Sequence, residues 1–370
     1  MIRAIAPLTA LTLLMAGCAM PPPQGITPYQ PTVYMTQVLA SQAKLGARPI
    51  ESLSPEAARL NPSIADGVHS VQTQLGQPLT PMPVGSYKNI SLQGAAGPIG
   101  ARVYTPANVA ANAPVILYFH GGGWVISTID TYDSSARALA NGANAIVISV
   151  EYRKAPENRF PAAHDDAIAA YKWTLANAAS LGGDPRRIAL AGESAGGNMA
   201  ITTAIAARDQ RLPMPVHELL VYPVASTDLT LPSVVENAKA KPLGKATLEW
   251  FVKYYTNSPA DLQDPRLNVV GTPNLAGLPP TTIVLAQIDP LRSGGELLAQ
   301  KLTAAGVPTE VRTYAGVTHE FFGTGAVVPT GQEAVGYASG RLRQSFAALP
   351  LAMQPAPMAM MPTRAGTLAR

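Results

Sequence analysis

The chain has 370 residues, of which 47% are hydrophobic and only 14% are charged. This composition can furnish a sizeable core, and a length of this order suits one large α/β domain with added segments. The net charge is +4, but the Lys and Arg residues are scattered and form no run of five or more. We therefore expect no nucleic-acid partner.

The first segment has the pattern of a secretory signal peptide. It begins with a cation at Arg3, continues through an apolar stretch at 4–16, and ends in small residues at Ala16 and Gly17. This apolar stretch is too short to remain in a bilayer as a spanning helix. The run Leu14-Met15-Ala16-Gly17-Cys18 also resembles the lipobox of bacterial lipoproteins, in which the cysteine is lipidated and becomes the new N-terminus. The alternative is an ordinary signal peptide that happens to contain a cysteine.

Cys18 is the only cysteine in the chain. An intramolecular disulfide and a catalytic or metal-binding cysteine cluster are therefore excluded. A lipid on Cys18 predicts a protein that is anchored to a membrane without spanning it. Because Ala19 follows instead of the aspartate associated with inner-membrane retention, we expect a cell-envelope protein that faces the periplasm from the outer membrane.

Both ends of the chain differ in composition from the middle. Residues 18–30 are rich in proline and predict a tether, and residues 350–370 repeat Met, Ala and Pro and predict a disordered tail. The folded domain is expected at 31–349.

Within that domain, apolar β-branched runs alternate with helical patterns, which is typical of a mostly parallel sheet covered on both faces. The expected strands are 86–93, 101–105, 115–120, 145–152, 188–192, 218–224, 281–288 and 309–314. The expected helices are 132–141, 162–179, 197–209, 295–305 and 332–349. The fold class is therefore α/β, with eight strands.

Two stretches do not fit the alternation, namely residues 31–80 and 227–275. The second carries an apolar stripe at roughly helical spacing, made of Leu248, Trp250, Phe251, Tyr254 and Tyr255. This stripe predicts either ordinary packing on the sheet or a cap that lines a ligand pocket.

The motif GESAG at 192–196 follows the strand at 188–192 and opens the helix at 197–209. This is the context of a nucleophile elbow, in which a serine sits on a strained turn between strand and helix. Ser194 is therefore the candidate nucleophile. Its place near a helix N-terminus favours negative charge that develops during the reaction.

A second glycine-rich motif, HGGGW at 120–124, directly follows the strand at 115–120. Such a loop supplies backbone N–H groups to an oxyanion hole, together with the residue after the nucleophile, here Ala195. A phosphate-binding loop is disfavoured, because neither GxxxxGK[ST] nor GxGxxG is present.

The candidate base is found by elimination. In folds with this elbow, the triad follows the chain order serine, acid, histidine. His69, His120 and His164 precede Ser194, and His217 follows it by too few residues to leave room for an acid at a strand end. His319 remains, in the loop after the last expected strand.

The candidate acid is Asp289, which stands immediately after the strand at 281–288. Open α/β sheets assemble their sites at the carboxyl ends of the strands. Asp228, Asp261 and Asp264 fall in the expected cap, and Glu320 adjoins the base, so each is less well placed.

With these residues in place, the chain resembles the hormone-sensitive-lipase-like bacterial esterases, also called the α/β-hydrolase fold-3 family. The resemblance extends from about Pro114 to Phe322, and it rests on the ordered motifs HGGGW, EYRKAPENRFPAAHDDA, DPRRIALAGESAGGN, LVYPV, GLPPTTIVLAQIDPLR and YAGVTHEFF. It implies an eight-stranded α/β-hydrolase fold with a helical cap from 31–80 and 227–275. It also implies that Gly122 and Gly123 contribute to the oxyanion hole.

Three residues depart from the family pattern. Glu193 stands where aspartate is commoner, Ser293 replaces an aspartate after DPLR, and Glu320 replaces the glycine after the histidine. None of them removes an element of the triad or of the oxyanion hole. The segment YRKAPENRF at 152–160 is expected to be structural, with Arg153 and Glu157 tying loops behind the site.

The resemblance implies a serine carboxylesterase for short-chain acyl esters, which needs no cofactor and no metal. A deacetylase, lactonase or amidase would use the same machinery, because selectivity lies in the pocket. A non-catalytic ligand-binding protein of the same fold is the other alternative, and the retained His319 argues against it.

Overall fold

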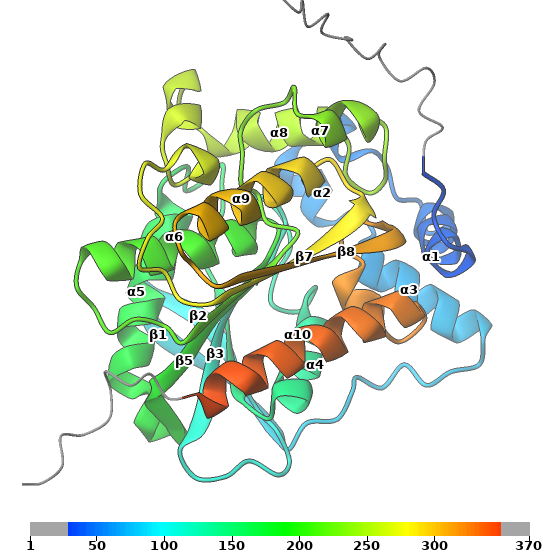
Figure 1. Ribbon diagram of the computed structural model, residues 1–370. Coiled ribbons are helices and arrows are strands. Elements are labelled where there is room, and N and C mark those ends of the chain that lie inside the picture. Colours follow the sequence, from blue (N-terminus) through cyan, green and yellow to red (C-terminus); the bar gives the residue numbers. More distant parts are fainter. Residues whose placement is uncertain (1–28, 349–370) are drawn as a thin grey trace, which may run out of the picture.

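An eight-stranded sheet forms the centre of the protein in the computed structural model, which describes residues 29–348 (Figure 1). The strands are β1 Ser86–Gly94, β2 Gly97–Thr105, β3 Ala113–Phe119, β4 Ile146–Glu151, β5 Gly183–Glu193, β6 His217–Val221, β7 Thr281–Ile288 and β8 Thr309–Thr318. Their order across the sheet is β1-β2-β4-β3-β5-β6-β7-β8. β2 pairs antiparallel with β1 and β4, and all other neighbours are parallel. The predicted fold class is confirmed.

The central strands are buried on both faces, which explains their continuous apolar sequences. In β3, Val115 and Phe119 pack into the core on one face, whereas Ile116 and Tyr118 pack into the core on the other. Side chains alternate between the two faces with every residue. A strand with helices on both sides therefore has no position for an exposed polar residue.

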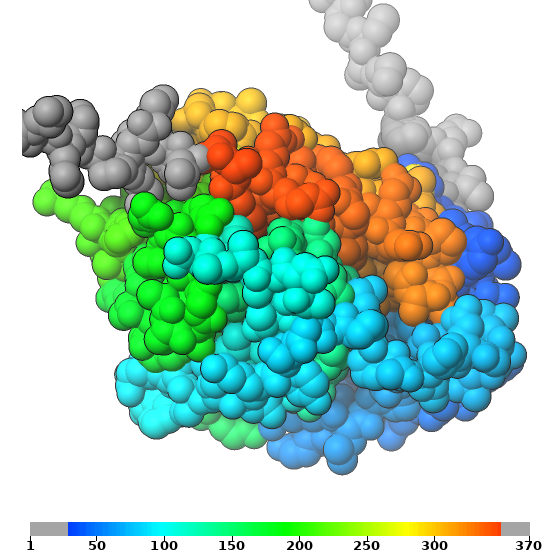
Figure 2. Space-filling model, turned by 90° about the horizontal axis from the view of Figure 1, so that it is seen from below, coloured from blue at the N-terminus to red at the C-terminus, as the bar shows by residue number. Residues whose placement is uncertain are grey.

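Helices cover both faces of the sheet, as Figure 1 shows. One face carries α5 Ala162–Asn177, α6 Ala195–Asp209 and α9 Arg292–Ala304. The opposite face carries α4 Asp133–Ala143 and α10 Pro329–Ala347. Figure 2 views the molecule from that side, with α10 in red and orange near the N-terminal segments in blue.

A further layer comes from two distant parts of the chain. The N-terminal part forms α1 Val33–Lys44, η1 Ile50–Ser52, α2 Pro55–Arg59 and α3 Ile64–Gln74. The insertion between β6 and β7 forms α7 Pro232–Glu236, α8 Lys245–Tyr255, η3 Pro259–Gln263 and η4 Val269–Gly271. The remaining short helices are η2 Ala178–Leu181 and η5 Phe322–Thr324.

These two parts are joined by side chains of α8. The Trp250 indole Nε1 donates a hydrogen bond of 2.9 Å to the Leu53 carbonyl oxygen, and the Thr247 hydroxyl donates one of 2.9 Å to Glu51. Of the apolar stripe of α8, Trp250 therefore contacts the N-terminal segment, whereas Phe251 packs on Gly123 and Tyr255 stacks on Trp124 with ring centroids 4.5 Å apart. The part of the N-terminal stretch around η1 lies beside α8, whereas α1 and α3 pack on each other at the β8 side of the sheet (Figure 1).

Several strands begin or end at other residues than the sequence predicts, because the local backbone conformation sets these limits. β6 ends at Val221 instead of 224, because Tyr222 has a φ of 35°, which no strand residue adopts. β8 continues to Thr318 through an irregularity near Gly316, whose φ is 65°. β5 begins at Gly183, which pairs with Ala113. The helices α1 and α3 were not predicted individually.

A buried carboxyl group in the sheet makes stability depend on pH. Glu218 in β6 is completely buried, one of its oxygens accepts a hydrogen bond from the Thr281 hydroxyl, and the other has no partner among the described residues. Burial raises the pKa of Glu218 to about 8, which the hydrogen bond opposes only partly. Because the pKa of Glu218 is higher in the folded protein than the usual value of 4.5, the folded protein binds this proton more tightly than the unfolded chain. The stability that this proton contributes is fully present below pH 4.5 and is lost as pH rises toward 8.

We therefore expect Glu218→Gln to raise the free energy of unfolding at about pH 9 by roughly 2 to 4 kcal/mol, since each pKa unit is worth about 1.4 kcal/mol. Near pH 5 the gain should vanish. Urea unfolding of both proteins across this range measures the effect. If the free energy of unfolding changed with pH in the same way for both proteins, Glu218 would not be the group responsible.

Candidate active site

Three loops at the carboxyl ends of the sheet bring the candidate residues together. Ser194 follows β5, Asp289 follows β7, and His319 follows β8. Because parallel strands end at the same edge of a sheet, residues more than a hundred positions apart meet there. All three side chains are buried or nearly so, with exposed fractions of 6%, 0% and 4% respectively.

The turn at Ser194 is strained, as expected for a nucleophile elbow. Ser194 has φ 58° and ψ −117°, a region that non-glycine residues rarely adopt. A Cβ at Gly192 would overlap the backbone of Gly196, and a Cβ at Gly196 would overlap the Phe119 carbonyl group. Both glycines are therefore required by close backbone approach, and the turn presents the Ser194 hydroxyl at the start of α6.

The three side chains form one chain of hydrogen bonds. His319 Nε2 lies 3.0 Å from Ser194 Oγ, and His319 Nδ1 lies 2.7 Å from Asp289 Oδ2. The second oxygen of Asp289 accepts the backbone N–H of Leu291 at 2.8 Å, which fixes the plane of the carboxylate. Asp289 has no proton to donate when ionised, so Nδ1 carries the hydrogen and Nε2 is free to accept the serine proton.

The surroundings of His319 favour its protonated form. Burial lowers the pKa of His319, but the charge and hydrogen bond of Asp289 outweigh this, and Glu320 and Glu193 add to the rise above the usual value of 6.5. The Tyr222 ring packs against the imidazole with centroids 4.5 Å apart. The histidine is thus held as a base whose conjugate acid is stabilised.

This raised pKa predicts the pH dependence of hydrolysis. The base works only when neutral, so kcat/KM should fall as pH drops through a value above 6.5. A kcat/KM profile for a neutral ester checks this. A profile that stays flat well below pH 6 would mean that His319 is not the base.

The loop after β3 has the left-handed backbone expected of an oxyanion hole. Gly122 and Gly123 have φ of 98° and 56°, a left-handed backbone that favours glycine. No described residue accepts a hydrogen bond from the N–H of Gly122, Gly123 or Ala195. The Gly122 carbonyl is held by the N–H groups of Val125 and Ile126 at 3.0 and 2.9 Å. These three free N–H groups are the ones that the sequence assigned to the hole.

Gly122 also has no room for a side chain, because a Cβ there would meet the Ile126 carbonyl group. We expect Gly122→Ala to displace the loop and to lower kcat by roughly 10²-fold, the usual loss for one oxyanion donor. Gly336→Ala in α10 is the matched control, since a Cβ at that position meets nothing within 4 Å. Full activity in Gly122→Ala would refute this role of the loop.

Buried tyrosines support the site, and motif analysis did not find them. The Tyr152 hydroxyl lies 2.9 and 3.1 Å from the carbonyl oxygens of His120 and Gly121, and so holds the start of the glycine loop. Tyr118 donates to Glu193 at 2.6 Å, and Tyr222 donates to the same carboxylate. Tyr118 lies in β3, and Tyr152 and Tyr222 directly follow β4 and β6 within the motifs EYRKAPENRFPAAHDDA and LVYPV, but these motifs alone do not indicate the partners of the hydroxyl groups.

The segment at 152–160 has the structural role predicted for it, and Arg153 and Glu157 have different partners. Arg153 Nε donates to Asp166 at 2.8 Å. Glu157 pairs with Arg59 of α2 at 2.6 Å, and Arg59 Nε also donates to the Val125 carbonyl at 2.9 Å. Arg59 thus ties α2 both to the end of the glycine loop and to the segment at 152–160.

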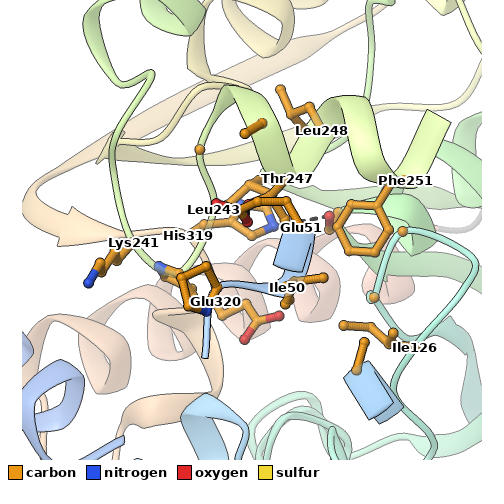
Figure 3. A pocket seen from close by; sticks show the side chains of 18 of the residues that line it. Ile50, Glu51, Ile126, Lys241, Leu243, Thr247, Leu248, Phe251, His319 and Glu320 are labelled. Atoms are coloured by element: carbon orange, nitrogen blue, oxygen red, sulfur yellow. Dashed lines mark hydrogen bonds between the residues drawn. The ribbon is translucent and has the colours of Figure 1, made fainter. Parts of the chain in front are cut away.

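A cavity of about 430 Å³ opens above Ser194 and His319. Figure 3 shows that its walls come from separate parts of the chain, with Ile50 from η1, Ile126 from the glycine loop, and Phe251 from α8. A Cβ at Gly123 would overlap the Phe251 ring, so α8 packs directly on the oxyanion loop. Within residues 29–348, no three His, Cys, Asp or Glu residues are grouped as metal ligands would be.

Comparison with known proteins agrees with this geometry. The family model described as the alpha/beta hydrolase fold matches residues 116–323. The chain belongs to this family. Within the α/β-hydrolase fold family, carboxylesterase NlhH of Mycobacterium tuberculosis is 45% identical over 67% of this chain and 79% of its own. Esterase LipI of the same species is 43% identical over 74% of this chain and 87% of its own.

A solved relative extends the likeness to three dimensions. The esterase of the hyperthermophilic archaeon Pyrobaculum calidifontis superposes with a TM-score of 0.77 at 33% identity, and covers 86% of this chain and all of that one. The protein is accordingly a carboxylic ester hydrolase, as the sequence predicted.

Proposed function

We propose that the protein hydrolyses short-chain acyl esters through an acyl-enzyme on Ser194, with His319 as base and Asp289 as the residue that orients it. The observation that carries this proposal is the hydrogen-bonded series from Asp289 through His319 to Ser194 at the floor of the cavity.

The first half of the reaction transfers the acyl group to the enzyme. Ser194 Oγ attacks the ester carbonyl carbon while its proton passes to His319 Nε2. The N–H groups of Gly122, Gly123 and Ala195 bind the resulting oxyanion. The carbon–oxygen bond to the alcohol then breaks, and His319 gives its proton to the leaving oxygen.

The second half releases the acid. A water molecule takes the place of the alcohol and loses a proton to His319 as it attacks the acyl carbon. The same three N–H groups bind the second oxyanion. The bond to Ser194 breaks, the serine oxygen recovers the proton from His319, and the carboxylic acid leaves.

The enclosed cavity favours small acyl groups. Phe251 lies against Gly123, and the α8 segment that carries it is fixed to the N-terminal helices through Trp250. A long acyl chain would have to displace one of these contacts. The cap formed by residues 31–80 and 227–275 is thus proposed to set the acyl limit.

A series of p-nitrophenyl esters from acetate through butyrate and octanoate to palmitate tests the acyl limit. We expect kcat/KM to be highest for acetate or butyrate and lowest for palmitate. Phe251→Ala should move the optimum toward octanoate. A preference of the unmodified protein for palmitate would contradict the proposal.

We further propose that the protein is secreted and lipidated at Cys18, and that it is held at the outer membrane facing the periplasm. Cys18 and the tether lie outside the described residues, so the support is the lipobox-like sequence at residues 14–18. None of the helices within residues 29–348 is long and apolar enough to cross a membrane. Metabolic labelling with an alkyne fatty acid in a bacterium should label the full chain and not Cys18→Ser. Equal labelling of both would overturn this proposal.

A further inference from the structure

Glu320, directly after His319, combines two unfavourable features. Its φ of 66° is left-handed, which is costly for a residue with a side chain. Its carboxylate is partly buried, and no Lys, Arg or His among the described residues forms an ion pair with it. Backbone strain at a residue beside a reacting group is a recognised sign of function.

The position of Glu320 is fixed by contacts on both sides. The Tyr132 hydroxyl donates to Glu320 at 3.3 Å, and the same hydroxyl lies so close to Gly121 that a Cβ there would overlap it. Glu320 is therefore held between the histidine loop and the oxyanion loop. It lines the same cavity as Ser194 and His319, and Figure 3 shows it there with His319.

Other carboxylates near His319 are already satisfied. Asp289 accepts from His319 and from the Leu291 N–H, and Glu193 accepts from two tyrosines. Glu320 has only the long hydrogen bond from Tyr132. Burial raises the pKa of Glu320, and the charge of His319 opposes this rise. When it is ionised, Glu320 is therefore the carboxylate near His319 that has the fewest partners and can meet a substrate cation.

The other charged residues that line the cavity lie at its solvent side. Arg48, Lys239, Lys241 and Glu51 are exposed, and Arg59 is paired with Glu157. Exposed charges are screened by water and salt, whereas a charge in an enclosed site acts at lower effective dielectric. Glu320 adjoins His319 and is less exposed than the charges of the rim, so water screens its charge less.

We propose that Glu320 determines charge selectivity, favouring esters whose alcohol part carries a cationic group such as a quaternary ammonium. The proposal rests on the roles given above to Ser194 and His319. His319 must pass its proton to the leaving oxygen, so the alcohol part lies on the His319 side of the scissile bond. A cation there would supply the charge partner that Glu320 lacks.

Two isosteric esters test this. Acetylcholine has a positively charged nitrogen where 3,3-dimethylbutyl acetate has a neutral carbon. The hydrolysis of each ester is followed with a pH-stat near pH 8 in dilute salt. We expect Glu320→Gln to lower the kcat/KM ratio of the cationic to the neutral ester by roughly tenfold, the size of a single charge interaction at intermediate dielectric. Glu320→Asp should keep most of the preference. Glu249→Gln, an exposed carboxylate of α8 that does not line the cavity, should change the ratio by less than about twofold.

If Glu320→Gln fails to fold, Glu320→Gly gives the answer, because glycine adopts a φ of 66° without strain and also removes the charge. A ratio that is unchanged in the neutral variants would overturn the proposal, as would an equal loss on both esters, which would indicate a purely structural role. Failure of the proposed function is distinguishable, because Ser194→Ala would then still hydrolyse the neutral ester.

Discussion

Replacing Ser194 by alanine is expected to lower kcat for p-nitrophenyl acetate by roughly 10⁵-fold or more, the scale of loss seen when a serine nucleophile is removed. The change deletes one oxygen, the atom 3.0 Å from His319 Nε2. The oxyanion hole and the cavity remain, so substrate binding should survive. Initial rates with the purified full chain measure the effect.

Ser91→Ala is the matched control for this experiment, because Ser91 lies exposed on the edge strand β1, far from the cavity in sequence and absent from its lining. It should keep full activity. Thermal unfolding should show both variants folded. Residual activity of Ser194→Ala within tenfold of the unmodified protein would exclude Ser194 as the nucleophile.

Asp289→Asn is expected to lower kcat by roughly 10⁴-fold, as for the orienting acid of other serine hydrolases. The Leu291 N–H is bonded to one carboxylate oxygen, so the amide oxygen of an asparagine would take that place. The amide NH₂ would then face His319 Nδ1. The imidazole would be forced to carry its hydrogen on Nε2, where it cannot accept the proton of Ser194.

Asp264→Asn provides the comparison, because Asp264 is a carboxylate of the insertion that competes for the same role by sequence alone. In the structure it pairs with Arg266 at 2.9 Å. Its loss should leave kcat within a few fold. A small effect of Asp289→Asn together with a large effect of Asp264→Asn would reverse the assignment.

The triad residues were predictable because each stands immediately after, or near, a recognisable strand. Strands such as β7 are buried on both faces and read as continuous apolar runs, so Asp289 marks a strand end without ambiguity. The fixed chain order of serine, acid and histidine removed the other four histidines. The structure places Ser194, Asp289 and His319 in one hydrogen-bonded series.

Contacts between distant segments could not be predicted in this way. Nothing local in α8 indicates that Phe251 packs on Gly123, or that Trp250 bonds to Leu53. The helices α1 and α3 also escaped prediction, although their buried residues join the core on the α4 and α10 face of the sheet. No signal in the residues next to Glu320 indicates its left-handed φ of 66°.

The most direct test of Ser194 as the nucleophile is covalent labelling with a p-nitrophenyl alkylphosphonate, followed by mass spectrometry of peptides. We expect a single adduct on the peptide that contains Ser194, formed in step with the loss of ester hydrolysis, and formed far more slowly in His319→Ala. An adduct on a different residue, or full hydrolytic activity in protein whose Ser194 is completely labelled, would contradict this role of Ser194.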